Sequence, residues 1–172
     1  MKLSTALPAT RVALRILNVL NWLGGAAILA LLVATIVAEQ WTFTALGITP
    51  SSGIPRMIMG LRAIAGLGVV AVPLNDVVLR RLLAIVETVR RGDPFVAANA
   101  TRLQAIGWAL LGLQLVTLVI GGIGRAVSTP ANPLHLNAGF SASGWLAVLL
   151  TFVLARVFAE GARMREDLEG VV

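Results

Sequence analysis

The sequence predicts an all-α polytopic membrane protein, a bundle of four transmembrane helices with the N and C termini both in the cytoplasm. Composition is the first reason, because 58% of the 172 residues are hydrophobic and 13% are charged, whereas soluble domains carry about 25% charged residues. The second reason is that the apolar residues gather in four long segments. These segments take up most of the chain, so we expect a single membrane domain over residues 1–172.

The first span is predicted over residues 16–38, which contain no charged residue. At about 23 residues, this segment exceeds the roughly 20 residues that a helix needs to cross the hydrocarbon core. It is also longer than the apolar core of a cleaved signal peptide, which has about 7 to 15 residues. The polar stretch from Glu39 to Pro55 is expected to form a loop on the outer side.

The second span is predicted over residues 57–79, although polar residues interrupt it. Arg62 lies near its outer end, and Asn75 and Asp76 lie toward its inner end. The segment is still long enough to span, because an arginine side chain can extend toward the surface and a carboxylate near the inner surface avoids the hydrocarbon.

Residues 80–102 are predicted to form a cytoplasmic loop that resembles a helix-turn-helix. The second helix should continue into this loop, because its apolar residues recur at helical spacing. Gly92 should end it, since glycine suits the left-handed cap. Asp93 and Pro94 should then open the next helix as N-cap and first helical residue. The third span follows over residues 103–124, again without a charge.

The fourth span is predicted over residues 137–156, after a loop in which Pro130 and Pro133 prevent regular helix. Its helix should continue into a cytoplasmic tail, residues 157–172, where opposite charges are spaced to pair along a helix.

The positions of the basic residues predict the orientation. About eleven of them fall on the side that holds both termini and the middle loop, and about three on the other, so the richer side should be cytoplasmic. Small basic groups at segment ends are typical of a membrane protein and do not form the continuous basic face that nucleic acid needs. We therefore expect a multi-pass protein of the bacterial inner membrane, in contact with the lipid bilayer and not directly with nucleic acid.

The side chains that most enzymes use are scarce. The chain has no cysteine, no tyrosine and one histidine, and Lys2 is its only lysine. Histidine and lysine are common general bases, and histidine and cysteine are the usual ligands of zinc. We therefore predict that the protein is not an enzyme and has no catalytic residues, cofactor or metal site.

Two segments carry a specific resemblance to a known family. The middle loop has Gly-Asp-Pro-Phe at residues 92–95, then Asn99 and Ile-Gly-Trp at residues 106–108, and the tail has Glu-Gly-Ala-Arg from residue 160. Together they resemble the domain-of-unknown-function 2975 family, bacterial membrane proteins with four predicted spans. The resemblance implies no activity and no catalytic residues. It does imply a regulatory partner, because such proteins are often encoded beside a small helix-turn-helix regulator of the Cro/C1 type.

The leading hypothesis is that the loop and the tail dock such a transcriptional regulator, with Phe95 as the anchor. The candidate partner-binding residues are Asp93, Pro94, Phe95, Asn99, Arg163 and Arg165. The alternative is ordinary turn chemistry, in which Asp93 and Asn99 cap helices, Pro94 begins one, and Phe95 packs against the end of the bundle.

The second hypothesis is a small carrier or channel for an ion or small molecule, formed by a homo-oligomer. Its polar path would be lined by Asn75, Asp76 and Gln114, since polar residues at membrane depth mark functional sites. Structural roles compete with this reading as well. Asp76 can pair with Arg80 four residues on, and the Gln114 amide can hydrogen-bond to another helix or subunit.

Overall fold

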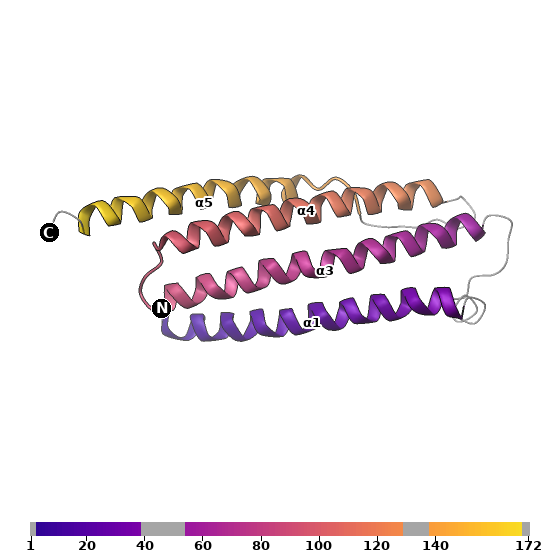
Figure 1. Ribbon diagram of the computed structural model, residues 1–172, viewed down its shortest axis with the longest axis horizontal. Helices are drawn as coiled ribbons and strands as arrows, with labels where there is room; N and C mark the ends of the chain where they lie inside the picture. Colours follow the sequence, from indigo (N-terminus) through magenta and orange to yellow (C-terminus); the bar gives the residue numbers. More distant parts are fainter. Residues whose placement is uncertain (1–2, 39–53, 129–137, 170–172) are drawn as a thin grey trace. The chain divides into compact units, whose positions relative to one another are not determined.

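The computed structural model describes residues 3–38, 54–128 and 138–169, and all regular structure in these ranges is helical (Figure 1). The described residues form four helices: α1 (Leu3–Val37), α3 (Ile54–Arg90), α4 (Ala97–Val127) and α5 (Ala142–Glu169). Each is long and apolar enough to cross a membrane. The all-α class and the four candidate spans are therefore confirmed. The cytoplasmic position of the termini stays a prediction from the charge distribution.

The helices are longer than the spans that the apolar segments predict. They contain 35, 37, 31 and 28 residues in chain order, so even the shortest is about 42 Å long at about 1.5 Å per residue. The hydrocarbon core is about 30 Å thick, so part of each helix extends beyond it. α3 continues through Pro73 to Arg90, which confirms that the second helix runs on past its apolar part.

The exposed surface of α5 is that of a lipid-facing helix. Six large aliphatic side chains recur with the spacing of one helix face and are each 45–63% exposed: Leu146, Leu149, Leu150, Val153, Leu154 and Val157. An apolar stripe of this size would be a liability in water, whereas in a bilayer it contacts acyl chains.

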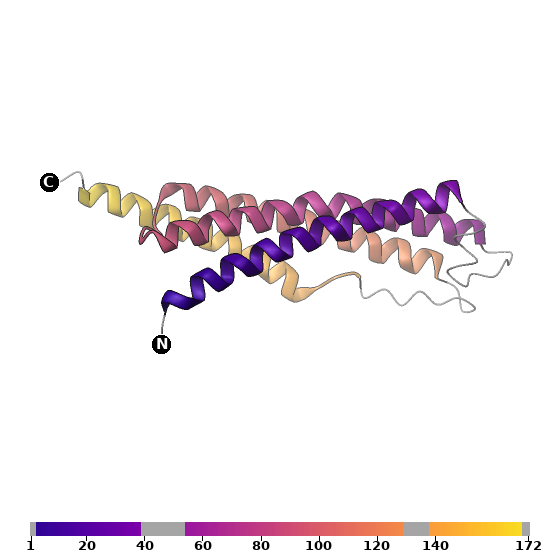
Figure 2. The ribbon, with the colours of Figure 1, turned by 90° about the horizontal axis from the view of Figure 1, so that it is seen from below.

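The turn between α3 and α4, visible in Figure 2, begins as predicted and ends differently. Gly92 has a φ of +82°. Its N–H donates to the Val89 carbonyl, and the N–H of Asp93 donates to the Thr88 carbonyl, each at 3.1 Å. These two bonds form a Schellman motif. Residues 93–96 are not helical, so Asp93 does not cap the next helix and Pro94 does not begin it. α4 starts at Ala97, which corrects the prediction.

The start of α5 also differs from the predicted fourth span. Residue 137 lies outside the described residues, and residues 138–141 are not helical. Gly139 has a φ of +155°, which suits glycine alone. The Ser141 hydroxyl then accepts a hydrogen bond from the Gly144 N–H at 3.2 Å and caps α5, so the helix begins at Ala142. The predicted outer loops fall largely on residues 39–53 and 129–137, outside the described residues.

The chain packs as two compact units. The first unit comprises Met1–Asn21, Leu74–Gln114 and Ser141–Val172, and the second comprises Trp22–Pro73 and Leu115–Phe140. In the first unit α3, α4 and α5 share a core. It is made of Leu103, Ile106 and Ala155, with Val78, Leu82, Ile85, Leu110 and Phe158 packed against them.

In the second unit, glycines allow close approach of neighbouring helices. A Cβ at Gly25 would lie 2.6 Å from a methyl group of Val72, and one at Gly60 would lie 2.6 Å from a methyl group of Val127. Arg62 also belongs to this unit, where its guanidinium donates a hydrogen bond to the Thr35 carbonyl of α1. Small residues at these crossings therefore set how closely the helices pack.

Candidate functional site

Asn99 is the centre of a hydrogen-bond network beneath the Gly92 turn, in the first unit. Its side chain is fully buried, with 0% exposure. Its amide nitrogen donates to the Thr88 hydroxyl at 2.7 Å and to the Pro94 carbonyl at 2.8 Å. Its amide oxygen accepts from the Arg102 guanidinium at 2.7 Å. One amide therefore joins the end of α3, the non-helical segment after Gly92 and the first turns of α4.

This position corrects both interpretations of Asn99. A fully buried side chain cannot contact a partner, and the residue lies inside α4, so it does not cap the third span. The sequence also offered no reason to single out Thr88, because an isolated threonine near a helix end has no distinctive spacing. Its role follows only from its distance to Asn99, which is eleven residues away along the chain.

The loop and the tail contact each other. The Phe95 ring packs against Phe158 of α5, with centroids 5.4 Å apart and planes tilted by 34°. It also covers Gly161, where a Cβ would lie 3.1 Å from the ring. The Arg165 guanidinium pairs with the Asp93 carboxylate. Phe95 is still 46% exposed, so one part of its ring packs on α5 and another part is accessible.

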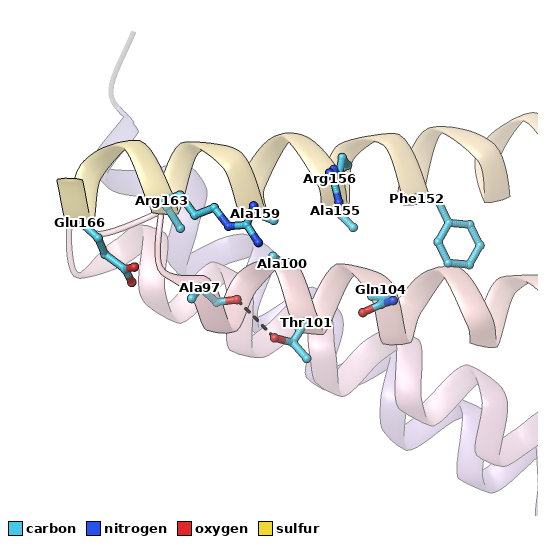
Figure 3. A pocket seen from close by; sticks show the side chains of 11 residues that line it. Ala97, Ala100, Thr101, Gln104, Phe152, Ala155, Arg156, Ala159, Arg163 and Glu166 are labelled. Atoms are coloured by element: carbon cyan, nitrogen blue, oxygen red, sulfur yellow. Dashed lines mark hydrogen bonds between the residues drawn. The ribbon is translucent and has the colours of Figure 1, made fainter. Parts of the chain in front are cut away.

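A groove of about 460 Å³ runs between α4 and α5 beside this contact (Figure 3). Its alanines, from both helices, are Ala97, Ala100, Ala155, Ala159 and Ala162. Ala155 and Ala162 are buried, which places them at the bottom of the groove. Its polar lining comes from Thr101, Gln104, Arg156, Arg163 and Glu166. The Arg163 side chain is 69% exposed and lies 3.9 Å from Glu160, so this cation is available at the edge of the groove.

A smaller hollow of about 210 Å³ continues the groove toward the turn. It shares Ala97, Ala162 and Glu166 with the groove and is also lined by Asp93, Phe95, Val96 and Arg165. Four of the residues predicted to bind a partner therefore line one continuous surface: Asp93, Phe95, Arg163 and Arg165. Pro94 contributes its carbonyl to the Asn99 network.

Two of the predicted intramembrane polar residues, Asp76 and Gln114, make contacts typical of structural roles. Asp76 is 8% exposed, and its carboxylate accepts from the Arg80 guanidinium at 2.8 Å. The Gln114 amide occupies the space that a side chain at Gly144 would take, since a Cβ there would lie 1.8 Å from the amide nitrogen. Asn75, Asp76 and Gln114 are not among the residues that line the two hollows described above.

The model of a family described as "Protein of unknown function (DUF2975)" matches residues 67–172. No curated protein and no solved structure matches the chain. The matched residues contain the turn, the Asn99 network and the groove, whereas α1 lies outside them.

Proposed function

This chain belongs to the DUF2975 family of proteins of unknown function, and we propose that it is a non-enzymatic docking protein of the bacterial inner membrane. Its four apolar helices make it a multi-pass membrane protein. The Gly92 turn and the tail would face the cytoplasm. There a small helix-turn-helix transcriptional regulator would bind to them and be held at the membrane.

The groove between α4 and α5 is the observation that carries this proposal. Its alanines leave room for the backbone of a partner helix to approach closely. The exposed Arg156 and Arg163 at its edge favour a helix with acidic side chains opposite them. An amphipathic helix that lies in a groove is a common mode of protein recognition, and we propose that a short surface helix of the regulator binds here in this way.

The contacts that hold the turn and the tail in place favour a docking role for the tail over a tail that is only solvated. The Asn99 network holds the turn to α3 and α4, and the Asp93–Arg165 pair with the Phe95–Phe158 contact holds the turn to α5. A surface that is ordered before binding loses less conformational entropy when a partner arrives. The scarcity of nucleophiles and bases in the chain favours binding over catalysis as its role.

The test uses the full chain in detergent and a small helix-turn-helix regulator of the Cro/C1 type, the kind of partner that the family resemblance implies. We expect the purified regulator to bind the wild-type chain, and the variant carrying both Arg156→Ala and Arg163→Ala to bind at least tenfold more weakly, since two charges at the groove are lost. The control is Arg81→Ala, which removes a single charge from an exposed arginine of α3 that does not line the groove. Biolayer interferometry at two salt concentrations gives both the affinity and the electrostatic part of the association rate.

Three results would contradict the proposal. The first is that the regulator does not bind the wild-type chain. The second is that the double variant binds as tightly as wild type. The third is that Arg81→Ala weakens binding as much as the double variant does, because the attraction would then depend on net charge and not on the groove.

A further inference from the structure

A cluster of arginines in the first unit is used neither by the turn nor by the groove. Arg11 and Arg15 lie on α1, and Arg90 is the last residue of α3. Together with Val12 they line a hollow of about 330 Å³. The hollow is therefore walled mainly by cations from two helices that are distant in the sequence.

Positive charge exceeds negative charge in this cluster. Glu87 is the carboxylate that meets the arginines: it lies 3.7 Å from Arg11, 2.7 Å from Arg90 and 3.3 Å from Arg91. One carboxylate offers about four lone-pair positions, whereas each guanidinium carries five N–H donors. The side chains of Arg11 and Arg90 are 41% and 51% exposed. Donors and positive charge therefore remain available to an anion from outside the chain.

The cluster stands next to an apolar surface. After Arg15, α1 continues without a charged residue to its end. Val12, Ile16 and Val19 recur on one side of this helix and are each 54–59% exposed. Cations at the end of an exposed apolar helix face match a molecule with an anionic head and hydrocarbon chains, and a small soluble anion would not use the apolar part.

We propose that this hollow binds the headgroup of an anionic phospholipid, with the acyl chains lying along the exposed apolar side of α1. Arginine pairs with phosphate through two parallel hydrogen bonds, which a headgroup phosphate can accept. Basic pockets between transmembrane helices on the cytoplasmic side are known to hold anionic headgroups. Glu87 competes with the phosphate for the same guanidinium groups, so it limits the affinity of the site.

Because Glu87 competes with the lipid for the arginines, substitutions of Glu87 and of the arginines should change the lipid affinity in opposite directions. The full chain in detergent is titrated with phosphatidylglycerol or with phosphatidylcholine, and native mass spectrometry counts the lipids bound. We expect phosphatidylglycerol to be preferred. Arg15→Gln and Arg90→Gln should each weaken its binding about fivefold, since a basic residue near a headgroup contributes about 1 kcal/mol. Glu87→Gln should strengthen it by a similar factor.

Arg81→Gln is the matched control, because it removes the same charge from the same helix outside the hollow. We expect it to leave binding unchanged. A gain with Glu87→Gln cannot come from misfolding, so this variant remains informative if an arginine variant is unstable. The proposal is overturned if phosphatidylcholine binds equally well, if Glu87→Gln does not raise the affinity, or if Arg81→Gln lowers it as much as Arg90→Gln does.

A last arm separates a lipid from a soluble phosphate compound. Glycerol 3-phosphate, added at the concentration of the lipid, should leave phosphatidylglycerol bound, because it lacks the acyl chains that the apolar side of α1 would contact. Full displacement would overturn the assignment to a lipid. No partner protein is present in this assay, and the double variant at Arg156 and Arg163 should bind lipid as the wild type does. A failure of the lipid proposal can therefore be distinguished from a failure of the docking function.

Discussion

The side chains at the Gly92 turn differ in burial and in the contacts that they make, although they are close in the sequence. Asn99 is fully buried and makes three hydrogen bonds. Phe95 is 46% exposed and packs on α5, and Asp93 both closes α3 and pairs with Arg165. The order of the turn therefore depends on Asn99, whereas contact with a partner would depend on the exposed residues around it.

We predict that Asn99→Ala destabilises the protein by about 2 kcal/mol, because it leaves buried donors and acceptors without partners. Unfolding in mixed micelles with increasing sodium dodecyl sulfate measures this change. The control is Thr101→Ala, which removes an exposed hydroxyl that donates to the Ala97 carbonyl at 3.3 Å, and it should alter stability by less than about 0.5 kcal/mol. Equal stability of the two variants would contradict the role of Asn99.

At the scale of elements, close backbone approach fixes where the chain returns toward α5. The Ala138 carbonyl lies directly over Gly121 of α4, where a Cβ would be 2.3 Å from its oxygen. A Cβ at the neighbouring Gly122 would meet nothing within 4 Å. Of these two adjacent glycines, only Gly121 is required by packing, because a larger side chain at Gly122 would meet no neighbouring atom.

This difference predicts opposite effects of the same substitution. Gly121→Ala must push the Ala138 backbone away and should cost about 1 to 3 kcal/mol, as overpacking does. Gly122→Ala should be neutral or stabilising by up to about 1 kcal/mol, because alanine is the better helix former. Thermal unfolding in detergent, followed by size-exclusion chromatography, compares the two. A loss of stability in Gly122→Ala as large as in Gly121→Ala would show that the close approach is not the cause.

For the whole molecule, the orientation in the membrane decides whether the proposed docking surface is accessible to a cytoplasmic partner. The prediction depends on the excess of basic residues on the side of the termini and the middle loop. The chain has no cysteine, so one introduced thiol reports its own position without interference. Ala98 and Ala126 are exposed and lie near opposite ends of α4.

We predict that, in intact bacteria, a membrane-impermeant maleimide labels Ala126→Cys and does not label Ala98→Cys. The two positions are about 42 Å apart along the helix, at about 1.5 Å per residue, so they should lie on opposite sides of the hydrocarbon core. After the cells are broken, both should be labelled, which controls for reactivity. The reverse pattern in intact cells would place the groove outside the cell and would exclude a cytoplasmic partner.

Much of the fold could be predicted from the sequence because it depends on local properties. The apolar segments predict the spans, and the recurrence of apolar residues predicts that α3 continues to Arg90. Gly92 predicts the end of that helix through its backbone freedom, as its φ of +82° confirms. The start of α4 could not be predicted in the same way. Asp93 and Pro94 have the residue types of a helix start, but the chain stays non-helical until Ala97. The contact between the Asn99 amide and the Pro94 carbonyl in this segment appears only in the folded chain.

The sequence by itself thus determined the membrane class, the four helices and the residues that make the loop and the tail distinctive. Only the tertiary structure decided what these residues do. Asp93 and Arg165 are 72 residues apart along the chain, and Phe95 meets Phe158 on another helix. No local pattern encodes such pairs, because they form only when separate helices pack together. For the same reason, the burial of Asn99 and the groove between α4 and α5 became visible only in the folded chain.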